Sequence, residues 1–389
     1  MIQSLLEYLI IKKLYMELFL HTPTSVGALS ALYKKAFGDA TELFIVTAYL
    51  TEWDSSLQLN NDCKSFRIII GKDFGITKKA ACEKVMQWLP SNRKSQFMVA
   101  DAISGFHPKA VFWKDSQGLC HSIIGSSNLT KAAFESNYEV NIYTQISESD
   151  YVQAKNWVKE IEKYSFVISE DWLLKYQEQK PKEQKNKSST SSSLYQSLIS
   201  LSLPMPENAK KALKDRRNKL ALYEKIKKDL YQLFRDCANG KIDSTKFYDR
   251  LLLLWNWDAG RLQGRGWERS GRNSDFELLS KSFVKILDAS AIDRDDIVVQ
   301  EIDHLSNKHV STRKAFLSEM LCLAYPDDYP LLNKPVHRYL IDIEFSAPKN
   351  ASEGSRYLDL AKKLRSSLLQ NPDYPAKNLA ELDALIWLH

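Results

Sequence analysis

The segment FHPKAVFW, residues 106–113, carries a histidine and a lysine two positions apart in an otherwise apolar run. Side chains two positions apart on a strand share a face, so a strand here would present His107 and Lys109 together. Histidine can attack phosphorus or transfer a proton near neutral pH, and a lysine ammonium attracts phosphate oxygens. The pair therefore indicates phosphate chemistry, provided that further polar groups lie close to it.

Two later segments supply such groups. Residues 125–128 read Gly-Ser-Ser-Asn at a predicted strand-to-helix junction, where glycine permits close backbone approach and free helix amides suit an anion. Asn128 offers a neutral donor, and Ser126 either contacts phosphate or caps the following helix. Glu139 begins the next predicted strand, and such an acid can hold an imidazole in one tautomer. His121, on the strand between, is either structural or functional.

In this order and spacing, the three motifs resemble the signature of the phospholipase D superfamily, the HKD motif. The usual aspartate shortly after the lysine is displaced, because Trp113 stands in its place and Asp115 is the nearest acid. With the trailing Glu139, this departure resembles the nuclease branch, and most of all its metal-independent restriction endonucleases. The chain has one H-x-K element, whereas the lipid-cleaving members usually carry two.

The resemblance implies a mechanism and a set of residues. Two chains would pair through their N-terminal domains as a homodimer, so that two copies of His107 face one phosphodiester. One would form a covalent phosphohistidine, and the other would protonate the leaving oxygen and then activate water. Lys109, Asn128 and Ser126 would bind the phosphate, and Glu139 would orient the imidazole. Neither a metal nor a cofactor would be required.

The length and composition of the chain are typical of a folded protein with more than one domain. The 389 residues are 44% apolar and 26% charged, and the five cysteines are scattered, which favours free thiols in a reducing, cytoplasmic setting. No stretch reaches the length of a membrane span, so no membrane partner is expected. The start, residues 4–20, contains interrupting charges and predicts a helix rather than a signal peptide. Met16 could serve as the initiator in place of Met1.

A polar stretch divides the chain. Residues 178–193 hold no apolar residue except Pro181, which predicts a solvated linker over 176–196. Before it, over 1–175, strand-like runs alternate with helical patterns, which predicts an α/β domain with a mixed sheet. The expected strands are 43–50, 66–73, 96–100, 107–114, 121–126 and 138–144.

The region 197–389 predicts a mainly α-helical domain for DNA targeting or regulation. Residues 208–238 read as a long helix with nine Lys or Arg between 210 and 228, either a solvated face or a nucleic-acid contact. The segment 255–272 interleaves arginines, glycines and tryptophans, which suits either nucleic-acid binding or a buried ion-pair network. The candidate DNA-binding residues are Lys210, Lys211, Lys214, Arg216, Arg217, Arg261, Arg265, Trp267, Arg269 and Arg272.

These observations together predict a metal-independent phosphodiesterase, an endonuclease that cleaves DNA in restriction or phage defence. A further defence-system subunit is a candidate partner. One alternative is a phosphodiesterase acting on phospholipid, against which the single H-x-K element speaks. The other is a non-catalytic DNA-binding or assembly module, against which the intact set of His107, Lys109, Asn128 and Glu139 speaks.

Overall fold

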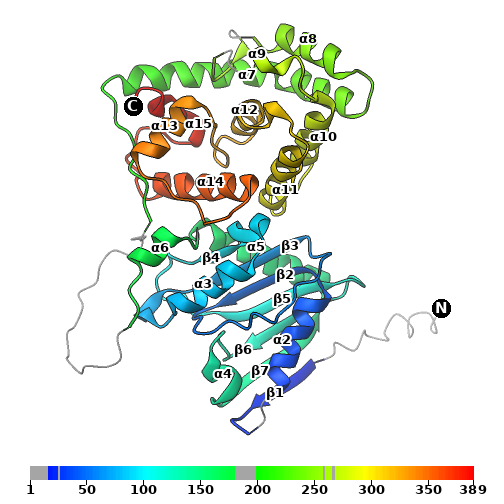
Figure 1. The fold of residues 1–389 in the computed structure, drawn as a ribbon, viewed down its shortest axis with the longest axis vertical. Coiled ribbons are helices and arrows are strands. Elements are labelled where there is room, and N and C mark those ends of the chain that lie inside the picture. Colours follow the sequence, from blue (N-terminus) through cyan, green and yellow to red (C-terminus); the bar gives the residue numbers. More distant parts are fainter. Residues whose placement is uncertain (1–15, 25–26, 180–198, 257–258, 265–267) are drawn as a thin grey trace, which may run out of the picture. The chain divides into compact units, whose positions relative to one another are not determined.

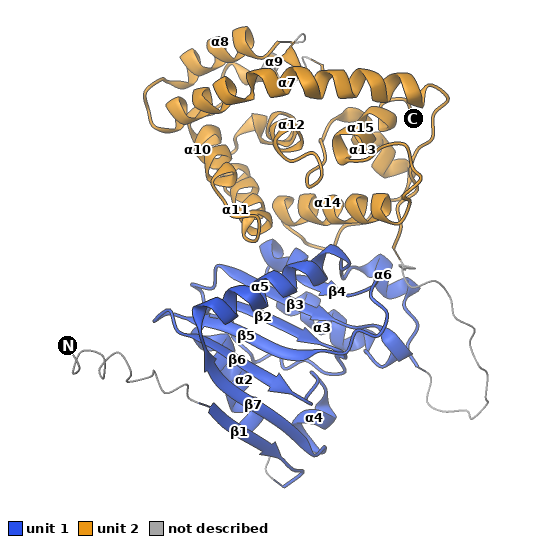
Figure 2. Cartoon of the chain, turned by 180° about the vertical axis from the view of Figure 1, so that it is seen from behind, with its two compact units in different colours: residues 1–198 blue, residues 199–389 orange. Residues whose placement is uncertain are grey.

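The computed structural model describes residues 16–24, 27–179, 199–256, 259–264 and 268–389. The chain divides into two compact units, residues 1–198 and 199–389 (Figure 2). Most of the expected linker, residues 180–196, lies outside the described residues. The described residues 176–179 belong to the first unit, where the main-chain N–H of Gln179 donates to the carbonyl of Gly75 at 2.7 Å.

The first unit is built on one mixed sheet, which confirms the predicted α/β class (Figure 1). Its eight described strands follow the order β1-β7-β6-β5-β2-β3-β4-β8. The pairs β2–β3 and β3–β4 are parallel, and the other neighbours are antiparallel. The strands are β1 (Met16–His21), β2 (Ala40–Thr47), β3 (Ser65–Ile70), β4 (Phe97–Val99), β5 (Lys109–Asp115), β6 (Cys120–Gly125), β7 (Glu139–Ile146) and β8 (Phe166–Val167).

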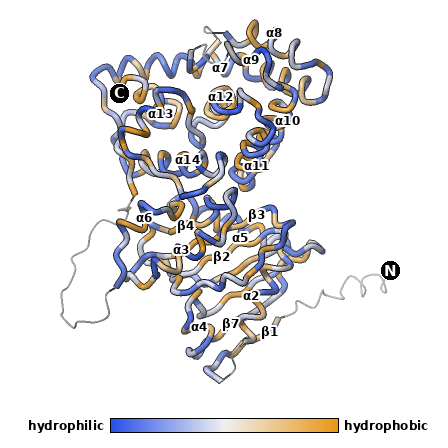
Figure 3. Tube along the Cα trace, in the orientation of Figure 1, coloured by the Kyte–Doolittle hydropathy of each residue, from blue (hydrophilic) through white to orange (hydrophobic). Residues whose placement is uncertain are grey.

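Helices cover both faces of this sheet, and apolar residues gather along its strands (Figure 3). One face packs on α5, where Arg67 of β3 and Glu162 form a buried ion pair with a 2.7 Å Nε–Oε1 distance. The other face packs on α2 and α3, where the ring of Phe37 lies 5.9 Å from that of Trp88. The helices of this unit are α2 (Ala28–Asp39), α3 (Lys79–Trp88), α4 (Lys131–Glu135), α5 (Glu148–Lys163) and α6 (Glu170–Lys175).

The helix expected over residues 4–20 is wrong for its last part. Residues Met16–His21 form the edge strand β1, which pairs antiparallel with β7. Leu18 and Leu20 alternate with Glu17 and Phe19, a period-2 pattern that the apolar run before it obscured. Residues 1–15 lie outside the described residues. Pairing with β7, more than a hundred residues later, decides the conformation here.

The second unit is helical, as predicted. Its core joins aromatic side chains from distant helices, and the rings of Phe234 and Phe283 lie 4.6 Å apart. The helices are α7 (Ala209–Ala238), α8 (Ser244–Leu254), α9 (Glu268–Gly271), α10 (Phe276–Leu287), α11 (Arg294–Asn307), α12 (Ala315–Ala324), α13 (Lys334–Asp342), α14 (Glu353–Leu369) and α15 (Leu379–Ile386). No described helix of either unit is long and apolar enough to cross a membrane.

Candidate active site

His107 and Lys109 lie together at the start of β5. Lys109 is the first residue of the strand, opposite Thr47 of β2, and His107 lies in the approach to it. The Lys109 Nζ lies 3.0 Å from Nδ1 and 3.3 Å from Nε2 of His107 and donates to the His107 carbonyl at 3.1 Å. The Lys109 ammonium therefore lies against the imidazole, close to both of its ring nitrogens. His107 itself is exposed and open to a ligand.

Asn128 is held beside this pair with its amide oriented. Its Oδ1 accepts hydrogen bonds from the main-chain N–H of Tyr49 at 3.2 Å and from the Thr47 hydroxyl at 3.3 Å. A main-chain N–H can meet only the oxygen of the amide, so the Nδ2 group turns away from these partners. Within the described chain Nδ2 has no partner, which leaves it free to donate to an anion.

The turn that carries Asn128 is locked to β7. A side chain at Gly125 would place a Cβ 2.6 Å from the Cα of Asn141, so this position requires glycine. The buried Asn141 Nδ2 donates to Ser127 Oγ at 2.8 Å. Asn141, which shares a face of β7 with Glu139, therefore fixes the turn rather than meeting a ligand.

Ser126 holds Glu139. Its hydroxyl donates to the Glu139 carboxylate and accepts from the Val140 N–H at 3.0 Å. The expectation that Ser126 caps the following helix is wrong, because Thr130 caps α4 by accepting from the Ala133 N–H at 3.1 Å. Because the single hydroxyl hydrogen of Ser126 is donated to the Glu139 carboxylate, Ser126 has none left to donate to a phosphate oxygen.

Glu139 lies close to the pair without a direct bond to the imidazole. Asn137 Nδ2 donates to its other oxygen at 3.0 Å, so both oxygens have partners, and within the described chain neither bonds to His107. The pKa of Lys109 is lowered by burial, and the nearby charge of Glu139 opposes that shift. Burial therefore disfavours the charged form of Lys109, and the negative charge of Glu139 partly offsets this effect.

Two other histidines of this unit are buried. His121 stacks on Trp113, and its ring nitrogens lie 2.8 Å from Asp115 Oδ2 and 3.1 Å from the Tyr143 hydroxyl. It pairs with Trp113, four strand residues from Lys109 or about 13 Å along β5, so it is structural. His21 lies opposite Glu139 in the β1–β7 ladder, is 5% exposed, and has no partner for either ring nitrogen in the described structure.

Sequence reasoning missed two contributors, Thr47 and Tyr49. Thr47 is the last residue of β2, Tyr49 follows the strand, and both support Asn128 from about 80 positions away. The available signal in the sequence was Thr47, a polar residue at the end of a buried strand. Only the pairing of β2 with β5 brings it to the site. In the part of the chain that the structure describes, no three or more His, Cys, Asp or Glu side chains are grouped to hold a metal ion.

The candidate DNA-binding residues of the second unit separate into different groups. Lys210, Lys211 and Lys214 are exposed on the first turns of α7. Arg216 is buried in an ion pair with Asp383 at 2.6 Å, so its assignment to a DNA surface is corrected. Arg217 is exposed, but its guanidinium binds Glu381 through two bonds of 2.7 and 2.9 Å.

The arginine-rich loop is in part a buried ion-pair network. Arg261 is 3% exposed, pairs with Glu268 and lies over the Trp255 ring, so it too is corrected as a DNA contact. Glu319 fixes the loop by accepting from the Leu262 N–H at 2.6 Å, and burial raises the pKa of Glu319 to about 7. Arg272 is exposed. Arg265, Trp267 and the side chain of Arg269 lie outside the described residues.

Residues 38–163, which include all four candidate catalytic residues, match the family described as "Cardiolipin synthase, PLD-like domain". This segment is a phospholipase D-like domain. Domains of that superfamily are typically phosphodiesterases. No protein with a curated description matches the chain.

Several solved structures are similar to part of this chain. NucT from Helicobacter pylori is 17% identical, covers 40% of this chain and 100% of its own, with a TM-score of 0.31. Nuc from Salmonella typhimurium, a phospholipase D family member, is 15% identical, covering 39% of this chain and 97% of its own, with a TM-score of 0.29. Phosphatidylserine synthase from Haemophilus influenzae Rd KW20 is 14% identical, covering 41% of each chain, with a TM-score of 0.30.

Proposed function

We propose that this protein is an endonuclease that cleaves DNA without a metal ion, through a phosphohistidine on His107. One observation carries the proposal: His107 and Lys109 meet at the start of β5, and Asn128, with its free amide donor, is bonded to the residues next to them, Thr47 opposite Lys109 and Tyr49 against the His107 ring. Glu139 lies near Lys109. This set offers a nucleophile, a cation and a neutral donor, which are the groups that a phosphodiester needs.

The proposed reaction has two displacements at phosphorus. A neutral His107 nitrogen attacks phosphorus, an N–P bond forms, and the P–O bond to the leaving nucleoside breaks as that oxygen receives a proton from a second imidazole. Water then attacks phosphorus, its proton returns to the second imidazole, and the N–P bond breaks. Lys109 and Asn128 bind the non-bridging oxygens and stabilise their developing charge.

The second imidazole is proposed to be His107 of a second copy of this chain. Leu18 of β1, Ile142 of β7 and Ile124 of β6 lie opposite one another on one face of the sheet, with exposures of 57%, 41% and 51%. Val140 extends this apolar patch to the end of β7 that carries Glu139, although the side chains of the two residues point to opposite faces of the sheet. A large exposed apolar patch marks an interaction surface, and this one reaches the same end of the strand as the site. A two-fold dimer through it fits the need for a second histidine.

The proposed setting is restriction or phage defence, and it rests on the resemblance of the motifs to metal-independent restriction endonucleases. The helical unit would then target or regulate the nuclease, with a further defence-system subunit as a candidate partner. Assays on plasmid DNA and on phosphatidylcholine vesicles test the substrate class. Activity on vesicles alone would contradict the proposal in favour of a phospholipid substrate, and inactivity on both would favour a binding module.

Cleavage of plasmid DNA is expected to survive about 10 mM EDTA with less than about twofold loss of rate, because the proposed chemistry uses cationic and neutral protein donors. The measurement is the initial rate of nicking with and without chelator. A metal-dependent nuclease assayed in the same buffers is the control. Loss of activity in EDTA that Mg²⁺ restores would contradict the metal-independent mechanism.

Lys109→Arg is expected to extend activity to higher pH. Burial lowers the pKa of Lys109, so the wild-type ammonium loses its charge, and with it phosphate binding, at a lower pH than an ordinary lysine. Arginine keeps its charge throughout, so the alkaline fall of kcat/KM should move upward, although the changed shape should lower the rate near neutral pH. The profile is measured from about pH 6 to about pH 10. An unchanged alkaline limb would show that Lys109 does not cause it.

Replacing Lys210, Lys211 and Lys214 together with glutamine is expected to weaken DNA binding about tenfold near 0.1 M salt and to flatten its salt dependence. These lysines are the exposed members of the predicted basic set on α7. The matched control replaces Lys281, Lys308 and Lys334, exposed lysines elsewhere in the same unit. Equal losses in both triple variants would show that net charge alone, rather than this end of α7, determines binding.

A further inference from the structure

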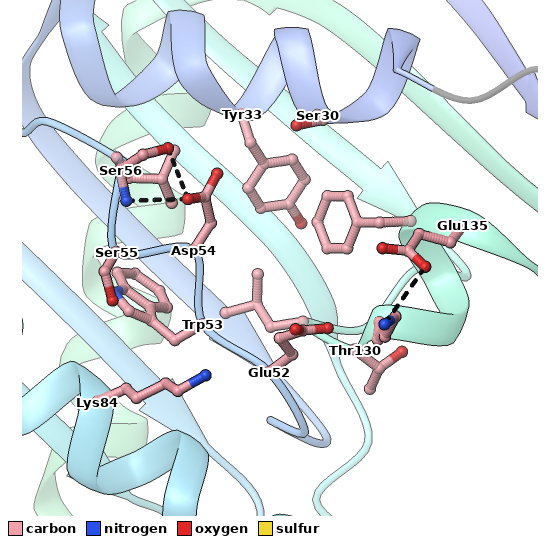
Figure 4. Close-up of a pocket in the computed structure, with 14 residues that line it drawn as sticks. Ser30, Tyr33, Glu52, Trp53, Asp54, Ser55, Ser56, Lys84, Thr130 and Glu135 are labelled. Atoms are coloured by element: carbon pink, nitrogen blue, oxygen red, sulfur yellow. Dashed lines mark hydrogen bonds and ion pairs between the residues drawn. The ribbon is translucent and has the colours of Figure 1, made fainter.

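A cavity of about 550 Å³ opens beside the candidate active site (Figure 4). Two of its walls continue directly from segments that build the site: Glu52–Leu57 follow Tyr49, and Leu129–Glu135 follow Asn128. The walls are joined, since Leu50 and Leu129 form a parallel bridge and the Thr51 N–H donates to the Leu129 carbonyl at 2.9 Å. The volume lies within the range of sites for small organic groups.

The third wall is α2, from which Tyr33 points into the cavity (Figure 4). The Tyr33 ring meets the ring of Phe134 edge-on, with centroids 5.2 Å apart. Burial, with a smaller contribution from Glu139, raises the pKa of the Tyr33 hydroxyl, which therefore stays neutral. Because Glu139 acts on Tyr33 as well as on Lys109, the cavity and the phosphate-handling groups are electrostatic neighbours.

The lining suits an uncharged aromatic group better than a second phosphate. Trp53, Leu57, Leu129 and Phe134 supply apolar surface, and three carboxylates face two lysines across the opening. Two of the carboxylates are engaged: Asp54 accepts from the Ser56 N–H at 2.9 Å, and Glu135 lies 3.8 Å from Lys131.

Glu52 is the remaining acceptor. It is exposed at the opening and has no hydrogen-bond partner among the residues that the structure describes. Lys84 extends toward the same opening from α3 (Figure 4). A carboxylate recognises groups that present N–H donors, such as the exocyclic amino group of cytosine.

We infer that this cavity binds a nucleobase next to the scissile phosphate, and that Glu52 accepts a hydrogen bond from its exocyclic amino group. The inference rests on the proposed function and adds a substrate class to it. A base inside a duplex is stacked and paired, so it reaches such a cavity only when it is single-stranded or turned out of the helix. The protein therefore prefers single-stranded or locally opened DNA with an amino-bearing base at the cut.

The test uses single-stranded oligonucleotides with one ordinary phosphodiester, all other linkages being resistant to cleavage. Both nucleosides flanking that linkage carry cytosine, carry uracil or are abasic. The wild-type full chain should cleave the cytosine substrate about tenfold faster than the other two, because the loss of one hydrogen bond to an exposed carboxylate costs roughly that factor. In Glu52→Gln the cytosine-to-uracil ratio should fall toward one, since an amide can also donate to the uracil oxygen.

The matched control is Glu83→Gln, an exposed glutamate on α3 outside the cavity lining, which should keep the wild-type ratio. Equal wild-type rates on cytosine, uracil and abasic substrates would overturn the base-binding cavity while leaving the nuclease intact. A wild-type ratio in Glu52→Gln would overturn the role of Glu52. Cleavage of phosphatidylethanolamine vesicles but of no oligonucleotide would overturn the proposed function, and an amino-alcohol head group would replace the base as the occupant.

Discussion

His107→Ala is expected to lower the rate of DNA cleavage by at least about 10³-fold, because the substitution removes nucleophile and proton donor together. DNA affinity should change less than about threefold, since the phosphate remains in contact with Lys109 and Asn128. Single-turnover cleavage and equilibrium binding of the same oligonucleotide measure the two effects separately.

His337→Ala is the matched control, because His337 is an exposed histidine on α13 in the other unit. It should cleave at the wild-type rate. Acid trapping of a labelled DNA adduct adds a direct readout: the wild-type chain should form an acid-labile covalent phosphoprotein, and His107→Ala should form none. Substantial turnover by His107→Ala would place the catalytic residue elsewhere.

A mixture of equal amounts of wild-type and His107→Ala chains is expected to keep about a quarter of the wild-type activity, because only dimers with two intact copies would work. The in-line reaction needs an imidazole on each side of phosphorus, and the chain offers one exposed histidine at the site. The other two histidines of this unit, His21 and His121, are buried. The mixture should be assayed after subunit exchange.

An activity of about half in the mixture would show that each chain works alone and would bring His21 into question as a second imidazole. Ile142→Glu supplies the control for assembly. This substitution places a charge in the exposed apolar patch of β1, β6 and β7, so it should shift the wild-type dimer toward monomer and reduce cleavage in parallel. Dimerisation that survives Ile142→Glu would move the interface to another surface.

Local sequence patterns were sufficient to predict the central strands of the sheet and the helical character of the second unit. The runs over 43–50, 66–73, 107–114 and 138–144 are rich in β-branched and aromatic residues, and each overlaps a strand. The patterns failed at Met16–His21, where six alternating residues follow a longer apolar run. An edge strand this short takes its conformation from its partner, and that partner, β7, lies far along the chain.

The sequence by itself determined which side chains could handle a phosphate, because histidine, lysine, asparagine and glutamate have chemistry that needs no structure to recognise. Their surroundings were decided only by the tertiary structure. Strand pairing brought Thr47 and Tyr49 to Asn128, and packing buried Arg216 and Arg261 against Asp383 and Glu268. Exposure and hydrogen-bond partners are properties of three-dimensional neighbours, so a lysine available to DNA and an arginine buried in an ion pair look alike in one dimension.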